Sequence, residues 1–283
     1  MSLVTGLRQL RHGPLRGLAP MWLRLGRLHR AALEWLPVAG ATEQRIGPYG
    51  PFRMNPLYAF SDFSNWGQGA NGRFRDCVEA SRGKRCMLDV GAHIGLVTLP
   101  VSRVLASGGR VYAFEPAEAN HRHLCEHLIM NEIDNVEVVQ ALVGAEESAA
   151  VPFFEQSEAS GMNSVVVVKD HDAYLENTRR QITLDGFCAE RDIAPEVIKI
   201  DVEGAELDVL AGSRETLRRC RPVIFLSIHP KHIEALGRSC AELAELIDSL
   251  GYLCEGRSGD PVADYRRDEY RLVPKERMEP NAR

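Results

Sequence analysis

The sequence lacks three features, each of which would assign it to a class of protein. It has no hydrophobic run approaching 18 residues, so we expect no transmembrane helix. Its seven cysteines are scattered without any C-x-x-C pair, which excludes a disulfide framework or a zinc site and favours a reducing cytoplasm. It also lacks a basic excess. The 34 basic and 39 acidic residues give a formal charge of −5, which argues against binding nucleic acid through bulk charge.

The composition that remains is that of a globular chain. Its 283 residues are 45% hydrophobic and 26% charged, and a chain of this size buries enough surface to fold without a disulfide or a metal. We divide it into a basic amino-terminal extension (residues 1–46), a lead-in rich in aromatics, proline and glycine (47–84) and a main domain (85–283). The lead-in predicts irregular structure with one short hairpin.

The amino-terminal extension has a charge opposite to that of the rest. Residues 1–45 hold seven arginines and two acids, a sum of +5, which leaves −10 for the remainder. Apolar residues recur at three- and four-residue steps between Leu18 and Leu36, and this spacing predicts an amphipathic helix. We expect its apolar stripe to pack on the chain's own core or on a second copy. Peripheral contact with an anionic membrane and a removed targeting segment are the alternatives.

From residue 85 onward, strands and helices alternate. This rhythm predicts an α/β fold with a doubly wound, mostly parallel sheet of the Rossmann-like kind. Residues 144–185 break the rhythm, and we predict an antiparallel insertion there, with β-like pieces at 148–154, 164–169 and 181–184. The predicted strands of the main sheet are 87–90, 110–114, 136–142, 196–200, 222–228, 252–255 and 271–274. The predicted helices are 94–105, 117–131, 204–219 and 239–250, the last opened by a capping box of Ser239 and Glu242.

The first functional motif is the turn after the first strand of this domain, Leu88-Asp89-Val90-Gly91-Ala92-His93-Ile94-Gly95. A glycine-rich strand-to-helix turn lets a ligand approach the backbone. The acid Glu115, which ends the second strand, suits the two hydroxyls of a ribose. Asp89 would repel a pyrophosphate but attract the ammonium group of S-adenosylmethionine (SAM). We therefore favour SAM over NAD. An NAD-linked reductase is the alternative, as is an Asp89 that only supports its own turn.

A second motif, Ile198-Lys199-Ile200-Asp201-Val202-Glu203-Gly204-Ala205-Glu206, begins at an apolar strand and runs into a helix. Ligands of open α/β sheets bind beyond the carboxyl ends of the strands, so Asp201 and Glu203 should face the same crevice as Asp89 and Glu115. Partnership with the helix dipole is an equally good explanation of the two acids. We interpret Lys199 as the structural partner of a nearby acid.

These strings, together with Phe114-Glu115-Pro116, Thr183-Leu184-Asp185 and Leu210-Ala211-Gly212, resemble the FkbM family of SAM-dependent methyltransferases over about residues 85–255. The resemblance implies a class I methyltransferase fold and O-methylation of sugar, glycolipid or natural-product hydroxyls. His93 stands where the family usually has Asn, and Ser227 stands where it commonly has Glu. The cofactor-binding candidates are Asp89, Gly91, Ala92, His93, Gly95, Glu115 and Leu142.

An alcohol nucleophile must lose its proton, and the candidate catalytic residues are Asp201, His229 and Glu203. His229 follows a predicted strand and has a suitable pKa for a base near neutral pH. We predict no metal site, because Asp201 and Glu203 have no evident third ligand. We expect His121, His123 and His127 of one predicted helix to be solvated. The acceptor is a small molecule, a sugar or a lipid-linked compound. An N-methyltransferase and a SAM-binding regulatory module without turnover stay open.

Overall fold

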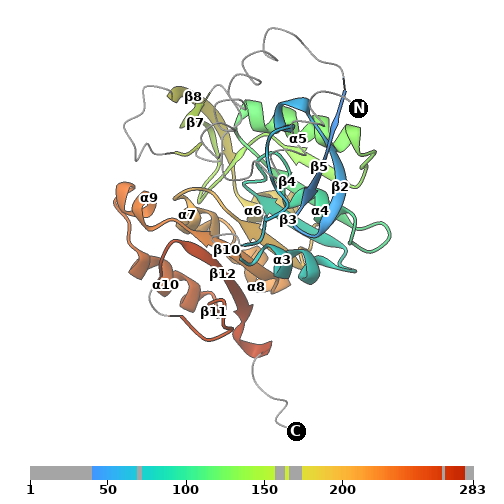
Figure 1. The fold of residues 1–283 in the computed structure, drawn as a ribbon. Helices are drawn as coiled ribbons and strands as arrows, with labels where there is room; N and C mark the ends of the chain where they lie inside the picture. Colours follow the sequence, from blue (N-terminus) through green and yellow to red (C-terminus); the bar gives the residue numbers. More distant parts are fainter. Residues whose placement is uncertain (1–39, 69–71, 157–162, 166–173, 263–264, 278–283) are drawn as a thin grey trace, which may run out of the picture. The chain divides into compact units, whose positions relative to one another are not determined.

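A computed structural model describes residues 40–68, 72–156, 163–165, 174–262 and 265–277 of the chain (Figure 1). The chain divides into two compact units. The first comprises residues 1–66 and 126–132, and the second comprises residues 67–125 and 133–283. The predicted helix at 18–36 lies outside the described residues. In the part of the chain that the structure describes, no helix is long and apolar enough to cross a membrane.

The first unit contains the predicted hairpin. Strands β1 (Thr42–Ile46) and β2 (Tyr49–Met54) pair antiparallel, and the short 3-10 helix η1 (Pro56–Tyr58) follows. The Asn55 side chain caps η1 by accepting a hydrogen bond of 2.9 Å from the Leu57 N–H. Arg53 and Asn131 exchange two hydrogen bonds, which fasten β2 to residues 126–132 of the same unit. A hairpin is present, as predicted, but only β2 lies in the predicted lead-in, whereas β1 lies before it in the predicted extension.

The second unit is built on a seven-stranded sheet in the order β11-β12-β10-β9-β3-β4-β5. The five strands from β10 to β5 are parallel, whereas β12 is antiparallel to both β10 and β11. The predicted mostly parallel, doubly wound fold is confirmed. The strands are β3 (Cys86–Val90), β4 (Arg110–Phe114), β5 (Val136–Val139), β9 (Val197–Ile200), β10 (Val223–Ile228), β11 (Tyr252–Glu255) and β12 (Asp268–Pro274).

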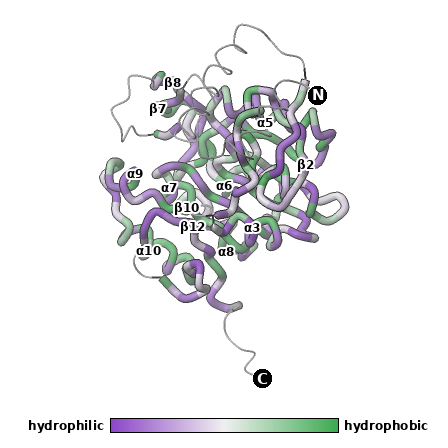
Figure 2. Tube along the Cα trace, in the orientation of Figure 1, coloured by the Kyte–Doolittle hydropathy of each residue, from purple (hydrophilic) through white to green (hydrophobic). Residues whose placement is uncertain are grey.

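Alternate side chains of the central strands point to opposite faces of this sheet. Leu88 and Ile198 enter the main hydrophobic core, which α6, α7, α8 and α10 cover. Asp89 and Lys199 point to the other face, where Thr98 of α4 bonds to Asp89. Along α10 the tube in Figure 2 alternates between hydrophobic and hydrophilic residues. The helices are α3 (Phe74–Ser81), α4 (Thr98–Ser102), α5 (Glu118–Met130), α6 (Leu184–Glu190), α7 (Glu206–Ala211), α8 (Arg214–Cys220), α9 (Pro230–Ala235) and α10 (Cys240–Ser249).

The predicted insertion is a separate three-stranded sheet in the order β6-β8-β7. Strands β7 (Ser148–Gln156) and β8 (Tyr174–Ile182) pair antiparallel, which confirms the prediction. Strand β6 (Leu142–Val143) pairs parallel to β8. The predicted strand at 136–142 is therefore divided between two sheets, with β5 in one and β6 in the other. Of the predicted strand at 164–169, residues 166–169 fall outside the described residues.

Several helix predictions were wrong. The helix predicted at 94–105 is only α4, because the chain keeps a non-helical turn with Gly95 at φ +94°. The helix predicted at 204–219 is divided into α7 and α8 at Gly212, where a Cβ would lie 2.0 Å from the Gly144 backbone oxygen. The short helices α3, α6 and α9 were not predicted. The helix opened by the Ser239–Glu242 capping box is confirmed.

Candidate functional site

The carboxyl ends of four parallel strands lie side by side, in the order β10-β9-β3-β4. Gly91, directly after β3, has a φ of +78° and packs against the end of β9. A Cβ at this position would lie 1.9 Å from the Asp201 backbone oxygen, so only glycine fits. The turn after β3 and the start of the second motif are thus held together by backbone packing.

Asp89 is fully buried and has partners within the fold. Its Oδ2 accepts a hydrogen bond of 2.6 Å from the Thr98 hydroxyl, and its Oδ1 lies 3.4 Å from Lys199 Nζ. Lys199 also donates 2.6 Å to the Gly91 carbonyl and lies 3.9 Å from Asp201. The prediction that Lys199 is the partner of an acid is confirmed. Contact between Asp89 and the methionyl end of a cofactor stays a prediction, and the carboxylate lies on the face that α4 covers rather than in an open crevice.

Glu115 links the end of β4 to the turn after β3. Its Oε2 accepts a hydrogen bond of 2.7 Å from the His93 N–H, while Oε1 accepts from the Ala117 N–H at 3.0 Å and from Asn120 at 3.3 Å. Burial raises the pKa of Glu115 to about 7, although these hydrogen bonds oppose the shift. A carboxylate has about four acceptor positions, and three are in use, so Glu115 can accept about one further bond from a ribose hydroxyl.

The other cofactor candidates fall into two groups. Gly91 and Ala92 donate their N–H groups to the Phe114 carbonyl at 3.0 Å, and Gly95 donates to Ala92 at 2.9 Å. These residues and His93 form the turn. Leu142 instead lies in β6, where it packs with Ala117 and Phe153 beneath the small sheet. The structure therefore brings Gly91, Ala92, His93, Gly95 and Glu115 together at one turn, and gives Leu142 a packing position.

Asp201, Glu203 and His229 come together at the neighbouring ends of β9 and β10, as predicted. The Nε2 of His229 lies 3.4 Å from Glu203 Oε1 and 3.7 Å from Asp201 Oδ1. Its Nδ1 lies 2.7 Å from Oε1 of Glu206, a fully buried side chain at the start of α7. We call these four residues the acid–histidine cluster. One ligand atom from each of Asp201, Glu203 and His229 can be chosen so that all three lie within 4.8 Å of one another.

The cluster shifts the pKa values of its members in the direction expected for crowded carboxylates. Burial lowers the pKa of His229, but the hydrogen bond to Glu206 and the charges of Asp201 and Glu203 outweigh it, so the net shift is upward. Burial raises the pKa of Glu203, and Asp201 and Glu206 add to this effect, while the charges of His229 and Arg267 oppose it. Glu203 is also held with φ at +48°, and its carbonyl accepts a hydrogen bond of 2.7 Å from Ser164.

Two residues of this region were missed. Glu206 belongs to the second motif, but its contact with His229 depends on the packing of β10 against α7, which spacing does not show. Glu269 of β12 lies opposite Ser227 in the antiparallel register. Burial raises the pKa of Glu269 to about 7, and Asp201 adds to the shift. A carboxylate thus stands on the strand beside Ser227. No signal in the sequence gives the register of β12.

The histidines of α5 correct another expectation. His123 and His127 are buried, with exposed fractions of 4% and 0%, so the prediction that they are solvated was wrong. His121 is partly exposed. The ring of His127 packs edge-on against Tyr58 of the same unit, with centroids 5.5 Å apart. The side chains of His123 and His127 are therefore part of the packing of α5.

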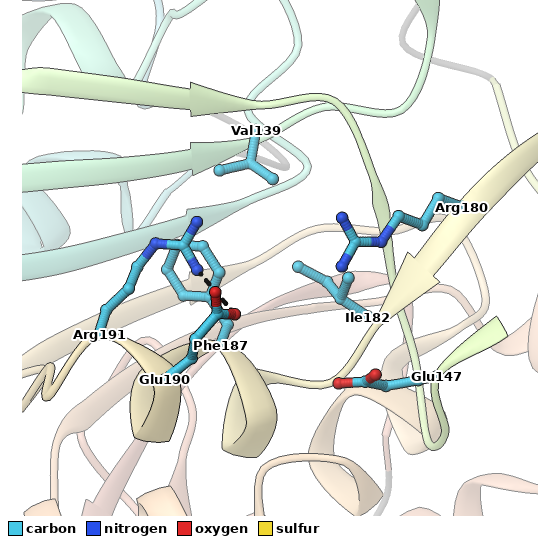
Figure 3. Close-up of a pocket in the computed structure, with 7 residues that line it drawn as sticks. All are labelled: Val139, Glu147, Arg180, Ile182, Phe187, Glu190 and Arg191. Atoms are coloured by element: carbon cyan, nitrogen blue, oxygen red, sulfur yellow. Dashed lines mark hydrogen bonds and ion pairs between the residues drawn. The ribbon is translucent and has the colours of Figure 1, made fainter. Parts of the chain in front are cut away.

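A separate pocket lies elsewhere in the second unit (Figure 3). Arg191 stacks 4.2 Å over the Phe187 ring and pairs with Glu190 at 3.3 Å, while Arg180 and Glu147 line the opposite side (Figure 3). Basic and acidic side chains balance there. The pocket shares no residue with the turn or with the acid–histidine cluster, so it gives no support to the predicted site.

The chain is similar to known methyltransferases. The curated relative "Methyltransferase 1" of Beauveria bassiana (strain ARSEF 2860) is 28% identical over 147 residues, which are 44% of this chain and 57% of that protein. The methyltransferase FkbM of Methylobacillus flagellatus KT is 22% identical, with a TM-score of 0.44, over 68% of this chain and 44% of its own. An O-methyltransferase of Bacillus cereus, solved in complex with SAH, is 14% identical, with a TM-score of 0.41, over 72% and 81%.

The chain thus spans less than two thirds of the length of the first two relatives. The family model "Methyltransferase FkbM domain" matches residues 89–254, which begin at Asp89 and include the turn, Glu115 and the acid–histidine cluster. This match covers more than half of the chain. The chain belongs to the FkbM methyltransferase family.

Proposed function

We propose that the protein is a SAM-dependent O-methyltransferase that acts on a hydroxyl of a sugar, glycolipid or natural product. The observation that carries this proposal is the acid–histidine cluster at the ends of β9 and β10. It lies directly beside a glycine turn whose Gly91 touches the Asp201 backbone. A cofactor bound at the turn and an acceptor bound at the cluster would therefore be neighbours.

The turn suits SAM in two respects. Glu115 retains acceptor capacity for one ribose hydroxyl, and the backbone of residues 91–95 comes close to the Glu115 carboxylate, as the 2.7 Å bond from His93 demonstrates. When bound, SAM supplies a methyl group on a sulfonium, whose sulfur takes the electron pair of the broken carbon–sulfur bond. The chain's own contribution is to hold the acceptor oxygen in line with that carbon.

The cluster suits a hydroxyl acceptor because such a group has a pKa far above neutrality. Its proton must leave while the carbon–oxygen bond forms, and a group positioned to assist is worth about 10²–10⁴-fold in rate. Asp201 is the most open of the three acids, with a side chain 34% exposed, whereas Glu203 is 13% exposed. Glu206 fixes the ring of His229 through Nδ1, so that Nε2 points toward these carboxylates.

The test is transfer of an isotopically labelled methyl group from SAM to a panel of sugars, glycolipids and polyketides, with amine analogues included. We expect labelled ethers and release of S-adenosylhomocysteine. His229→Asn should reduce kcat by about 10²-fold, whereas the control His121→Asn on α5 should not. Label found only in amine products would indicate an N-methyltransferase. SAM binding without transfer to any acceptor would indicate a regulatory module.

A further inference from the structure

The acid–histidine cluster has more negative than positive charge. Three carboxylates, those of Asp201, Glu203 and Glu206, lie within 3.7 Å of the imidazole of His229, and a second histidine, His232, has its Nδ1 3.8 Å from Glu203 Oε2. Nearby cations are divided among other partners. Lys199 is 3.9 Å from Asp201 but 3.4 Å from Asp89, with its shortest bond to the Gly91 carbonyl. Even with a protonated His229 and the charge of Arg267, which acts on Glu203, the three acids keep an excess of negative charge, so the site favours an added cation.

Among the three outer groups, the 3.4 Å distance is that of two ligands on one ion, and the 3.7 Å distance is slightly longer. Donor atoms that are each 2.0–2.2 Å from a metal lie about 3.0–3.4 Å apart at octahedral or tetrahedral angles. The Nε2 of His229 is 3.4 Å from Glu203 Oε1 and 3.7 Å from Asp201 Oδ1, and the three ligand atoms lie within 4.8 Å. His229 supplies the third ligand that the spacing of Asp201 and Glu203 did not reveal.

Glu206 gives an independent reason to expect a metal. Metal-binding histidines usually donate their second ring N–H to a carboxylate, which fixes the tautomer and aims the other nitrogen at the ion. The Nδ1 of His229 lies 2.7 Å from Oε1 of Glu206, an acid with an exposed fraction of 0%. Its second oxygen, Oε2, is buried without a hydrogen-bond partner among the described residues. Such a carboxylate is costly to bury unless it supports a charged group nearby.

We propose that Asp201, Glu203 and His229 bind one divalent cation, with Glu206 positioning His229. The mixture of carboxylate oxygens and one imidazole nitrogen suits Mn²⁺ and similar first-row ions. Three protein ligands leave open positions on a six-coordinate ion. The hydroxyl oxygen of the acceptor occupies one of these open positions, a statement that rests on the proposed function. The cation lowers the pKa of that hydroxyl, and the proton leaves to solvent.

The first experiment measures cation binding alone. The full chain is freed of metal with EDTA, and binding of Mn²⁺ is followed by electron paramagnetic resonance without SAM or acceptor. We expect one site per chain. Glu203→Gln and His229→Gln should each weaken binding more than about 10-fold, and Glu206→Gln should weaken it by about 10–100-fold. The control Asp208→Asn removes a partly exposed acid from α7 and should leave binding unchanged. Circular dichroism confirms that each variant folds.

The outcomes separate this proposal from the proposed function. The cation site is overturned if no Mn²⁺ is bound at a concentration of about 1 mM. This concentration is close to the dissociation constant of weak extracellular calcium sites. Equal binding by the wild type and Glu203→Gln overturns the site as well. Full methyl transfer in EDTA also overturns it and leaves direct proton acceptance by His229 or Asp201, with the methyltransferase intact. Tight Mn²⁺ binding that depends on these ligands supports the site, even if no acceptor is methylated, in which case only the proposed function fails.

Discussion

Two regions at one edge of the same parallel sheet hold their carboxylates in opposite ways. In the turn region, residues 89–95 and Glu115, the buried acids have matching partners: Asp89 accepts a hydrogen bond from Thr98 and forms an ion pair with Lys199, and Glu115 accepts from two backbone N–H groups and Asn120. In the acid–histidine cluster, three carboxylates surround the imidazole of His229, and the Nδ1 of His232 lies 3.8 Å from Glu203. Paired charges stabilise a fold, whereas carboxylates crowded together favour the binding of a positively charged ligand. The comparison therefore separates residues that shape the site from residues available for chemistry.

The largest expected effect tests whether the turn region is fixed by sterics. Gly91→Ala places a Cβ 1.9 Å from the Asp201 backbone oxygen in a position with φ of +78°. We expect a loss of about 4 kcal/mol or more in the free energy of unfolding, measured by urea denaturation. Gly108→Ala is the matched control, because Gly108 has a φ of +75° with nothing within 4 Å of the added Cβ. It should lose only about 1–2 kcal/mol. Equal losses would show that φ alone matters.

A second pair of variants compares the two regions directly. Asp89→Asn leaves Lys199 buried without its paired charge and should lower the free energy of unfolding by about 3 kcal/mol. Glu203→Gln removes one of the crowded carboxylates, so stability should stay level or rise at pH 7 without added metal. Both are measured by urea denaturation in EDTA. If Glu203→Gln destabilises the protein as much as Asp89→Asn does, the cluster is a structural network and the comparison fails.

A third prediction concerns how the stability of the protein changes with pH because of Glu269, the buried acid on the strand beside the acid–histidine cluster. Burial raises its pKa to about 7, so the folded state binds the proton more tightly than the unfolded chain. The stability that this proton gives is complete below about pH 4.5 and is lost as the pH rises through 7. Glu269→Gln should match the wild type near pH 5 and exceed it by about 2 kcal/mol at pH 8. The exposed control Glu234→Gln should follow the wild type throughout. A wild-type advantage at pH 8 would contradict the assigned shift.

The fourth prediction concerns affinity rather than stability. Glu115→Ala should weaken SAM binding by about 5–150-fold, because a ribose hydroxyl would lose its acceptor, a cost of about 1–3 kcal/mol. Isothermal titration calorimetry measures this loss. Glu118→Ala is the control, because Glu118 begins α5 shortly after Glu115 in the chain and has a side chain 73% exposed. Unchanged SAM affinity in both variants would remove Glu115 from the cofactor site, while the acid–histidine cluster would be unaffected.

The sequence predicted the central sheet because its strands are short, apolar and ended by glycine or acidic residues. It also predicted that Asp201 and His229 end neighbouring strands, since parallel order follows from the alternation of elements. It could not predict how Glu206 meets His229, which depends on α7 packing under β10. Nor could it show that Asp89 points to the α4 face, because that depends on the register of β3 with β9. The order of the elements could be predicted from the sequence, but the direction in which each side chain points could not.

Helix ends were the other source of error. Residues 94–105 have the apolar pattern of a helix, but the turn with Gly91, His93 and Gly95 at positive φ continues past residue 95. At Gly212 the chain needs a close approach to the Gly144 backbone, which divides one apolar pattern into α7 and α8. In both places the residues have the apolar pattern of a helix, but tertiary contacts keep the helix from forming over its full length.

The smallest expected effect concerns how an acceptor reaches the cluster. If the acceptor is lipid-linked, the basic segment before Gly40 can hold the protein at an anionic membrane, where each arginine near the surface contributes about 1 kcal/mol. The full chain should sediment with phosphatidylserine vesicles, and less so at high salt. The shortened chain must begin at Gly40, because β1 starts at Thr42. It should not sediment, yet its SAM affinity should be unchanged, since the turn region contains none of the removed residues. Equal sedimentation of both chains, or of neither, would remove the membrane contact and favour packing of the segment on the protein or on a second copy.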